Sequence, residues 1–252
     1  MKYNFCRVSL YFSVLLLFCF TMNLRAQRRA ECYVIRSDGS KLQGRELSVD
    51  SKGVLTLIVD DKMRMPFSPG SYKHGFVPKP KEVEELEKLY EEKKFAELAA
   101  KAPQVFEKYK LLGWCNVIAA LHAEALLQEN KSADARKVIA SAARMSGEFR
   151  ESLDAAIVKL YIADKEYDKA EAILRRQLRS AEDQAAAQAF LLMGELAEAK
   201  NDKKQAVLEY LKVMMLFEGR RVKDEKALAK SRATKLMREM RDPRVDKITA
   251  YE

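Results

Sequence analysis

The sequence predicts a mainly α-helical protein, in which an alpha-alpha solenoid of helical hairpins follows a small antiparallel β barrel or sheet (α+β overall). From residue 81 to residue 217 glycine occurs only three times, and the strong helix formers Ala, Leu, Glu and Lys dominate. Residues 31–77 instead form short β-rich runs between turn residues. Pro78-Lys79-Pro80 separates the two regions, because two prolines interrupt both helices and strands.

Residues 1–26 have the pattern of a secretory signal peptide that is cleaved after Ala26. Lys2 and Arg7 give a positive start, and residues 8–20 are nearly all apolar. This run is shorter than the roughly 20 residues of a transmembrane helix, although a retained membrane anchor is the alternative. Removing the leader lowers the formal charge from +9 to +6. We therefore expect an exported, periplasmic protein that is soluble or peripherally associated with the cell envelope.

Two of the four cysteines belong to this leader, which leaves Cys32 and Cys115. They fall in different predicted regions, one on a strand and one on a helix. We expect both to be small buried apolar residues, and a disulfide between them is the alternative in an oxidising compartment.

Residues 27–78 predict a small β module. Strands are expected at 31–36, 41–49, 54–59, 63–67 and 72–77, with turns of Asp, Ser, Gly and Pro between them. Pro66 places the fourth strand at an edge, because proline cannot donate to a ladder. The module is expected to be a small barrel, such as an SH3-like one, or a curled sheet.

Residues 79–218 carry an internal repeat. Ala135, Ala170 and Ala206 recur at intervals of 35 and 36 residues. A small residue, Ala123 or Gly194, stands twelve positions before Ala135 or Ala206. Paired small residues let two antiparallel helices approach closely, and the short polar turns between the runs favour such hairpins. We expect about four of them.

The pattern resembles that of the tetratricopeptide repeat family. The best match comprises Phe190 to Gly194, Ala206 and Glu209-Tyr210-Leu211, and Tyr161, Tyr167 and Ala170 form the next. The resemblance implies a TPR-like solenoid over about residues 81–218, with a degenerate first hairpin at 86–109 in which Pro103 stands where the second helix should continue. The closing proline of the family pattern is missing, so an unrelated solenoid or a helical bundle is the alternative.

The resemblance also implies a binding face, formed by the first helix of each hairpin. In this chain that face comprises Val117, Ala120, Glu124, Gln128, Lys159, Gln188, Leu191, Glu195 and Glu198. Family members that hold a peptide carboxylate have lysine and asparagine where this chain has Glu124 and Glu195, so that activity is not implied. A protein segment is the expected partner, and a merely solvated groove is the alternative.

Residues 219–252 predict a basic C-terminal helix, over 220–241, that caps the stack, followed by a tail. Between Arg220 and Lys247 there are eleven basic and five acidic residues. The basic face comprises Arg220, Lys223, Lys226, Lys230 and Arg241. Such a face attracts anionic envelope polymers or lipid headgroups, although most charged helix faces are only solvated. No nucleic acid partner is expected, because aromatic residues for base stacking are missing.

The sequence contains no catalytic, metal-binding or cofactor-binding motif that we recognise. His74 and His122 have no partners at ligand spacing, residues 68–75 lack the order of a phosphate loop, and Asp60-Asp61 is expected to be a turn. The expected function is a non-catalytic exported scaffold that binds another protein. The alternative is an envelope-polymer or membrane-surface binder that uses the β module and the basic helix. An enzyme is disfavoured, and the oligomeric state is left open.

Overall fold

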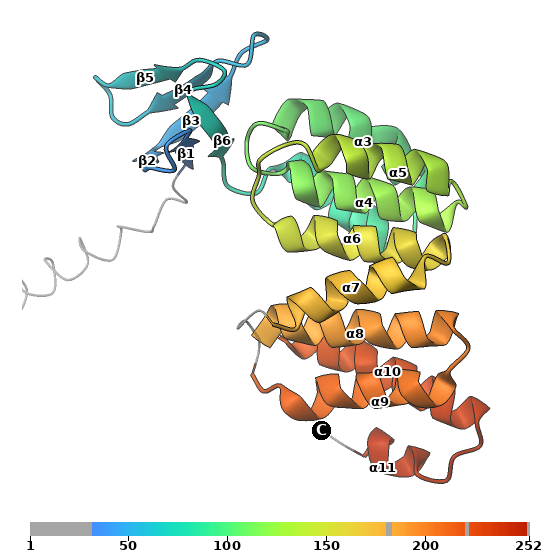
Figure 1. Cartoon of the computed structure of the whole chain (residues 1–252). Coiled ribbons are helices and arrows are strands. Elements are labelled where there is room, and N and C mark those ends of the chain that lie inside the picture. The colour runs from blue at the N-terminus through green and yellow to red at the C-terminus, as the bar shows by residue number, and fades with distance from the viewer. Residues whose placement is uncertain (1–31, 180–182, 220–221, 251–252) are drawn as a thin grey trace, which may run out of the picture. The chain divides into compact units, whose positions relative to one another are not determined.

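The computed structural model describes residues 32–179, 183–219 and 222–250 (Figure 1). The predicted leader with its cleavage site, and Arg220 of the predicted basic face, lie outside the described residues. The chain divides into two compact units, Met1–Pro78 and Lys79–Glu252, which are described separately. Within the described ranges, no helix combines the length and the apolar character that a bilayer crossing requires.

The first unit contains two three-stranded antiparallel sheets. The strands are β1 (Cys32–Arg36), β2 (Lys41–Gly44), β3 (Glu46–Val49), β4 (Leu55–Ile58), β5 (Arg64–Phe67) and β6 (Tyr72–Phe76). Their orders are β2-β1-β6 and β3-β4-β5. The expected antiparallel pairing is therefore present, but the sheets do not close into a barrel, which corrects that part of the expectation.

The strand expected at 41–49 is divided at Arg45 into β2 and β3, one for each sheet. Gly44 explains the break, because a Cβ at this position would lie 2.7 Å from the carbonyl oxygen of Ile58. The backbone N–H of Arg45 donates to that same oxygen at 2.7 Å. This close approach lets one continuous segment leave the first sheet and enter the second.

Aspartates stabilise three turns of this unit. Asp38, Asp50 and Asp60 each accept a hydrogen bond from the backbone N–H two residues later, at 2.8 to 2.9 Å. This Asx-turn geometry stabilises tight reversals between strands. Asp60 is thus a turn residue in the structure.

The second unit is helical in its described part. Its helices are α2 (Lys81–Glu91), α3 (Phe95–Tyr109), α4 (Cys115–Gln128), α5 (Ser132–Ala142), α6 (Arg150–Ala163), α7 (Tyr167–Gln177), α8 (Asp183–Ala199), α9 (Lys203–Leu216), α10 (Lys223–Glu239) and α11 (Val245–Thr249). Consecutive helices pack as hairpins, α2 with α3, α4 with α5, α6 with α7, α8 with α9 and α10 with α11. Helix α6 also contacts both α4 and α8, and Figure 1 shows α4 and α6 side by side.

All five hairpins turn in the same way. After the first helix one residue takes a positive φ, and these residues are Lys93, Asn130, Lys165, Asn201 and Arg241. The N–H of the next residue donates to the carbonyl oxygen five positions earlier, at 2.8 to 2.9 Å; the pairs are Lys94 to Leu89, Lys131 to Leu126, Glu166 to Tyr161, Asp202 to Ala197 and Asp242 to Met237. This is the Schellman motif, which satisfies carbonyl groups at a helix end.

The repeated alanines occupy equivalent places. Ala135, Ala170 and Ala206 each stand at the fourth residue of the second helix of a hairpin, and all three are fully buried. Leu98 takes this place in the first hairpin and is also fully buried. Small side chains thus lie at corresponding helix contacts in three successive hairpins.

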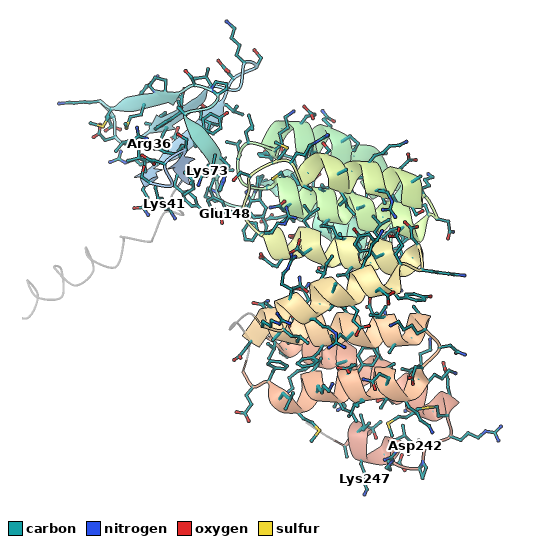
Figure 2. All side chains as sticks on the ribbon, viewed as in Figure 1. Arg36, Lys41, Lys73, Glu148, Asp242 and Lys247 are labelled. Atoms are coloured by element: carbon teal, nitrogen blue, oxygen red, sulfur yellow. The ribbon has the colours of Figure 1, made fainter. Side chains whose placement is uncertain are left out.

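Both ends of the helical unit differ from the expectation. The helix α3 continues through Pro103, which lies exposed on its surface, so the first hairpin is complete. The terminal helix is α10, and the same turn as in the other hairpins leads from it through Asp242 (Figure 2) into the short α11, whose Ile248 is buried. Helix α10 thus packs on α9 and forms a short hairpin with α11 at the end of the unit.

Candidate functional site

A cavity of about 370 Å³ opens on the first helices of the hairpins. Five helices contribute to it: α2, α4, α6, α8 and α10. Its lining residues are Tyr90, Glu124, Leu127, Gln128, Lys159, Ile162, Ala163, Glu195, Leu228 and Arg232. We call this cavity the inner groove.

The polar residues of the inner groove follow the repeat. Tyr90, Glu124, Lys159, Glu195 and Arg232 stand 34, 35, 36 and 37 residues apart, one on the first helix of each hairpin. They therefore occupy corresponding positions of five consecutive hairpins. We call these five residues the polar ladder.

Direct contacts join the first three members of the ladder. The hydroxyl of Tyr90 donates to Oε2 of Glu124, and Nζ of Lys159 donates to the same oxygen at 2.6 Å. One carboxylate on α4 thus links the preceding and the following hairpin.

At the other end of the polar ladder, Arg232 contacts two carboxylates of α8. Its NH2 lies 3.3 Å from Oε1 of Glu195, and its NH1 lies 3.0 Å from Oε1 of Glu198. The hydroxyl of Tyr210, a fully buried residue of α9, donates to Glu198 as well. This guanidinium holds two carboxylates of α8 against α10.

The lining of the groove has two carboxylates and two cations, and Glu198 beside it adds a third carboxylate. Glu124, Glu195 and Glu198 face only Lys159 and Arg232. Burial raises the pKa of the Glu195 carboxyl, and the nearby charges of Lys159 and Arg232 oppose that effect only in part. The charged form of Glu195 is therefore held at an energetic cost.

Burial also affects the ladder's other titratable groups. It raises the pKa of Tyr90 to about 12, and the charge of Glu124 adds to the effect. Burial is the largest single effect on Lys159 and by itself would lower its pKa. The charges of Glu124, Tyr90 and Glu195 together outweigh burial, so the net shift of the pKa is upward. At neutral pH Tyr90 remains a hydrogen-bond donor and Lys159 remains a cation.

The structure distributes the predicted binding residues unequally. Glu124, Gln128, Lys159 and Glu195 line the inner groove, and Glu198 joins it through Arg232. The other predicted residues do not line it. Ala120 and Leu191 are buried in hydrophobic clusters, and Val117 and Gln188 are half-buried elsewhere on α4 and α8.

Sequence reasoning missed Tyr90 and Arg232, and it also missed the apolar lining residues Leu127, Ile162, Ala163 and Leu228. The repeat spacing could have predicted Tyr90 and Arg232. Tyr90 lies 34 residues before Glu124, and Arg232 lies 37 residues after Glu195. Tyr90 was not predicted because the first hairpin was expected to be degenerate. Arg232 was not predicted because α10 was expected to be a capping helix.

The predicted basic face lies on α10 and the turn that follows it. Lys223 and Arg241 are exposed, and Lys226 and Lys230 are half-buried. A shallow cavity of about 560 Å³ accompanies this face; Ala227, Lys230, Ser231, Thr234, Lys235, Arg238 and Glu239 line it. Glu239 already pairs with Lys203 at 2.9 Å, so the basic side chains dominate the lining.

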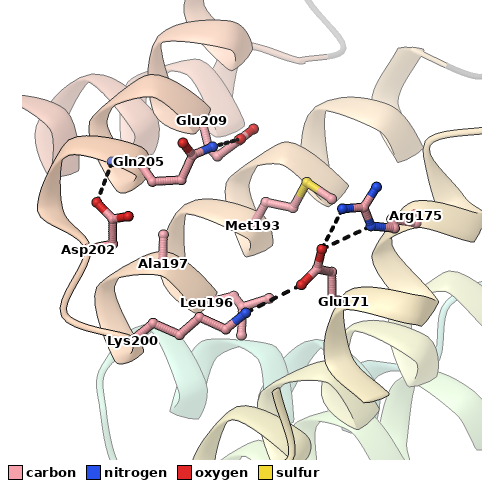
Figure 3. A pocket seen from close by; sticks show the side chains of 9 residues that line it. All are labelled: Glu171, Arg175, Met193, Leu196, Ala197, Lys200, Asp202, Gln205 and Glu209. Carbon is pink, nitrogen blue, oxygen red and sulfur yellow. Dashed lines mark hydrogen bonds and ion pairs between the residues drawn. The ribbon is translucent and has the colours of Figure 1, made fainter. Parts of the chain in front are cut away.

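A third cavity, of about 280 Å³, lies between α7, α8 and α9 (Figure 3). Its polar side chains are joined to one another. Glu171 pairs with Arg175 at 2.6 Å and with Lys200 at 3.3 Å, and Asp202 accepts from the backbone of Gln205 at 3.0 Å. These contacts serve the packing of α7 on α8 and the start of α9.

The remaining candidate residues are placed inside the units. Cys32 and Cys115 are buried free thiols. His74 is buried on β6, and burial lowers the pKa of His122 on α4, which keeps that imidazole neutral at pH 7. Across the described ranges, no three His, Cys, Asp or Glu side chains are grouped so that they could hold a metal ion.

Comparisons with protein-family models, with curated proteins and with solved structures find no match for this chain.

Proposed function

We propose that the protein is a non-catalytic, exported scaffold of TPR-like hairpins that binds a segment of another protein in the inner groove. The observation that carries the proposal is the polar ladder, in which corresponding positions of five hairpins contribute to one cavity. Repeat arrays use such continuous faces, built from one position of each repeat, to bind extended partners.

The chemistry of the groove supports binding rather than catalysis. Its lining contains carboxylates, a lysine and an arginine that pair with one another, together with Leu127, Ile162 and Leu228. The lining residues include no Ser, Cys or His that a neighbouring base could activate. The leader pattern of residues 1–26 supports export.

The groove favours a partner segment with both a positively charged and an apolar side chain. The four charged side chains that line the groove balance one another, and Glu198 beside them leaves an excess of one carboxylate, so a partner lysine or arginine improves the balance. Leu228, which is 43% exposed, offers apolar surface at the same cavity. Complementary charge also selects against acidic segments.

Site-specific photo-cross-linking tests the proposal. A photoreactive residue at Gln128, exposed in the inner groove, should capture a discrete protein in the intact cell envelope. The same residue at Lys137, exposed on α5, is the matched control and should capture none. Leu228→Ser, Glu124→Lys or Glu195→Lys should weaken capture. Equal capture at both positions, or none at Gln128, would contradict the proposal.

A second candidate is binding to an anionic envelope polymer or membrane surface through the β module and the basic face. The shallow cavity with Lys230, Lys235 and Arg238 favours it. Such binding should weaken steeply as salt is added, because it depends on screened charges. Lys223→Glu combined with Lys230→Glu should abolish sedimentation with anionic vesicles or envelope polymer, and unchanged sedimentation would exclude this candidate.

A further inference from the structure

Helix α9 exposes large apolar side chains to solvent. Leu208, Met215 and Leu216 are 48%, 65% and 63% exposed. They are three of the five large apolar residues that lie exposed in the described part of the chain. Exposed apolar side chains gathered on one short element mark interaction sites in soluble proteins.

The other hairpins provide an internal control. The positions that correspond to Leu208 in α3, α5 and α7 are Ala100, Lys137 and Ala172. Counted in the same way, Met215 corresponds to Glu107 in α3 and to Arg144 and Arg179, which lie two residues beyond the ends of α5 and α7. All six are exposed, and all are small or charged. The hairpin architecture therefore does not require apolar residues at these places, and α9 carries them for another reason.

The apolar residues form one stripe. Leu208, Leu211 and Met215 have the spacing i, i+3, i+7, which places them on the same side of a helix. Leu211 is half-buried, and Leu216 lies beside Met215 at the end of α9. This spacing is that of a seam between two helices. We call these four residues the α9 stripe.

The two ends of the stripe carry opposite charges. Lys204 precedes Leu208 by one turn, and Glu218 follows the end of α9; both are exposed. In an antiparallel pair with its two-fold axis near Leu211, Leu208 of one copy faces Met215 of the other. Lys204 of each copy then lies toward the C-terminal end of its partner's α9, the end that Glu218 follows. The stripe is therefore complementary to itself, as a two-fold interface requires.

We propose that the α9 stripe is a self-association surface, on which a second copy of this chain docks in antiparallel orientation. A membrane surface fits less well, because two of the three lysines of α9 are already neutralised: Lys203 by Glu239 at 2.9 Å and Lys212 by Glu209 at 2.8 Å. One helix from each copy buries less than the roughly 1,600 Å² of a standard interface, so the dimer is reversible.

This inference goes beyond the proposed function, because the stripe lies on α9 and the inner groove is lined by other helices. A dimer would present two grooves at once. Two linked grooves bind a repeated or multivalent partner more tightly than either groove alone.

Analytical ultracentrifugation of the naturally processed protein over a wide concentration range tests the proposal. We expect a reversible monomer–dimer equilibrium. Leu208→Lys combined with Met215→Lys should raise the dissociation constant more than about tenfold, since it removes the centre of the seam. Met63→Lys, at a 50% exposed methionine of the first unit, is the control and should leave the dimer unchanged.

A charge exchange tests the orientation. Lys204→Glu should weaken the dimer, and adding Glu218→Lys to the same chain should restore it, because an antiparallel seam brings the start of α9 in one copy close to the end of α9 in the other. A wild-type protein that stays monomeric up to high micromolar concentration would overturn the proposal. So would a stripe-dependent binding to anionic vesicles by a monomer, which would identify the occupant as a membrane. Circular dichroism of each variant separates lost association from lost folding.

Discussion

At the scale of single residues, Gly194 of α8 packs closely against Tyr210 of α9. A Cβ at Gly194 would lie 2.3 Å from Cε1 of Tyr210, whose ring is fully buried. The tyrosine hydroxyl also donates to Glu198, so the ring is held at both its edge and its end. A glycine inside a helix, normally unfavourable, is here the condition for close packing.

We therefore expect Gly194→Ala to destabilise the protein by about 1–3 kcal/mol, as overpacking does. The same change in an unobstructed helix would stabilise it by about 1 kcal/mol, so the sign is diagnostic. Chemical denaturation measures the difference. In a Tyr210→Leu background, Gly194→Ala should lower the free energy of unfolding much less. An equally large loss of stability there would show that the tyrosine ring is not the obstacle.

Glu195 contributes a carboxylate to the proposed binding groove, and burial of that carboxylate lowers the stability of the fold. Because its pKa is raised in the folded state, the folded protein binds a proton more tightly than the unfolded chain does. Its charge therefore lowers stability above that raised pKa, and the penalty disappears as the pH falls through it.

We expect Glu195→Gln to raise the free energy of unfolding at pH 7, with the gain vanishing under acidic conditions. Glu171→Gln is the matched control with the opposite sign. Hydrogen bonds from Arg175 and Lys200 lower the pKa of Glu171, so its charge stabilises the fold at neutral pH and that stabilisation is lost in acid. Urea titrations at several pH values measure both. A loss of stability in Glu195→Gln at pH 7 would contradict the inference.

At the scale of elements, the five hairpin turns place a non-glycine residue at a positive φ. The two asparagines, Asn130 and Asn201, tolerate this conformation, whereas Lys93, Lys165 and Arg241 adopt it with strain. The polar residues of these turns predict where the chain reverses. They do not predict which residue takes the positive φ, because no glycine marks that position.

Lys165→Gly should therefore stabilise the hairpin of α6 and α7 by about 1 kcal/mol, after the greater freedom of glycine in the unfolded chain is subtracted. Ala172→Gly, at an exposed position inside α7, should instead destabilise by about 1 kcal/mol. Thermal unfolding of the two variants shows whether the change in stability depends on the turn geometry or on the added glycine alone.

Sequence patterns located the strands and helices well but missed how one strand is shared. All five expected strand regions contain strands, yet the region 41–49 serves two sheets. Its division at Arg45 depends on the approach of Gly44 to Ile58, a tertiary contact that no local pattern reveals. Residue alternation predicts that a segment is extended and not which neighbours it has.

At the scale of the whole helical unit, the period of three dozen residues predicted both the hairpins and part of the inner groove. Glu124, Lys159 and Glu195 could be predicted because they lie in the three regular repeats. Tyr90 could not, because Leu98 replaces the small residue that would have fixed the register of the first hairpin. The role of Arg232 depends on α10 being a repeat helix, which only its turn into α11 reveals.

A stack of hairpins unfolds from its ends, because each hairpin is stabilised by its neighbours alone. The last hairpin has one neighbour and a second helix of only five residues. Arg232 ties it to α8 through Glu195 and Glu198, which makes this side chain a clamp on the end of the stack. Its side chain is 39% exposed, so solvent screens part of the attraction.

Replacing the clamp should loosen the end and spare the centre. We expect Arg232→Leu to lower the free energy of opening of α10 and α11 by about 1–2 kcal/mol, because two half-buried carboxylates lose their cation. Amide hydrogen exchange should then quicken in α10 and α11 and stay unchanged in α4 and α5. Lys235→Leu, at an exposed position one turn further on, is the control and should alter neither region. Faster exchange throughout all five hairpins would instead mean that the unit opens only as a whole, with no separable terminal hairpin.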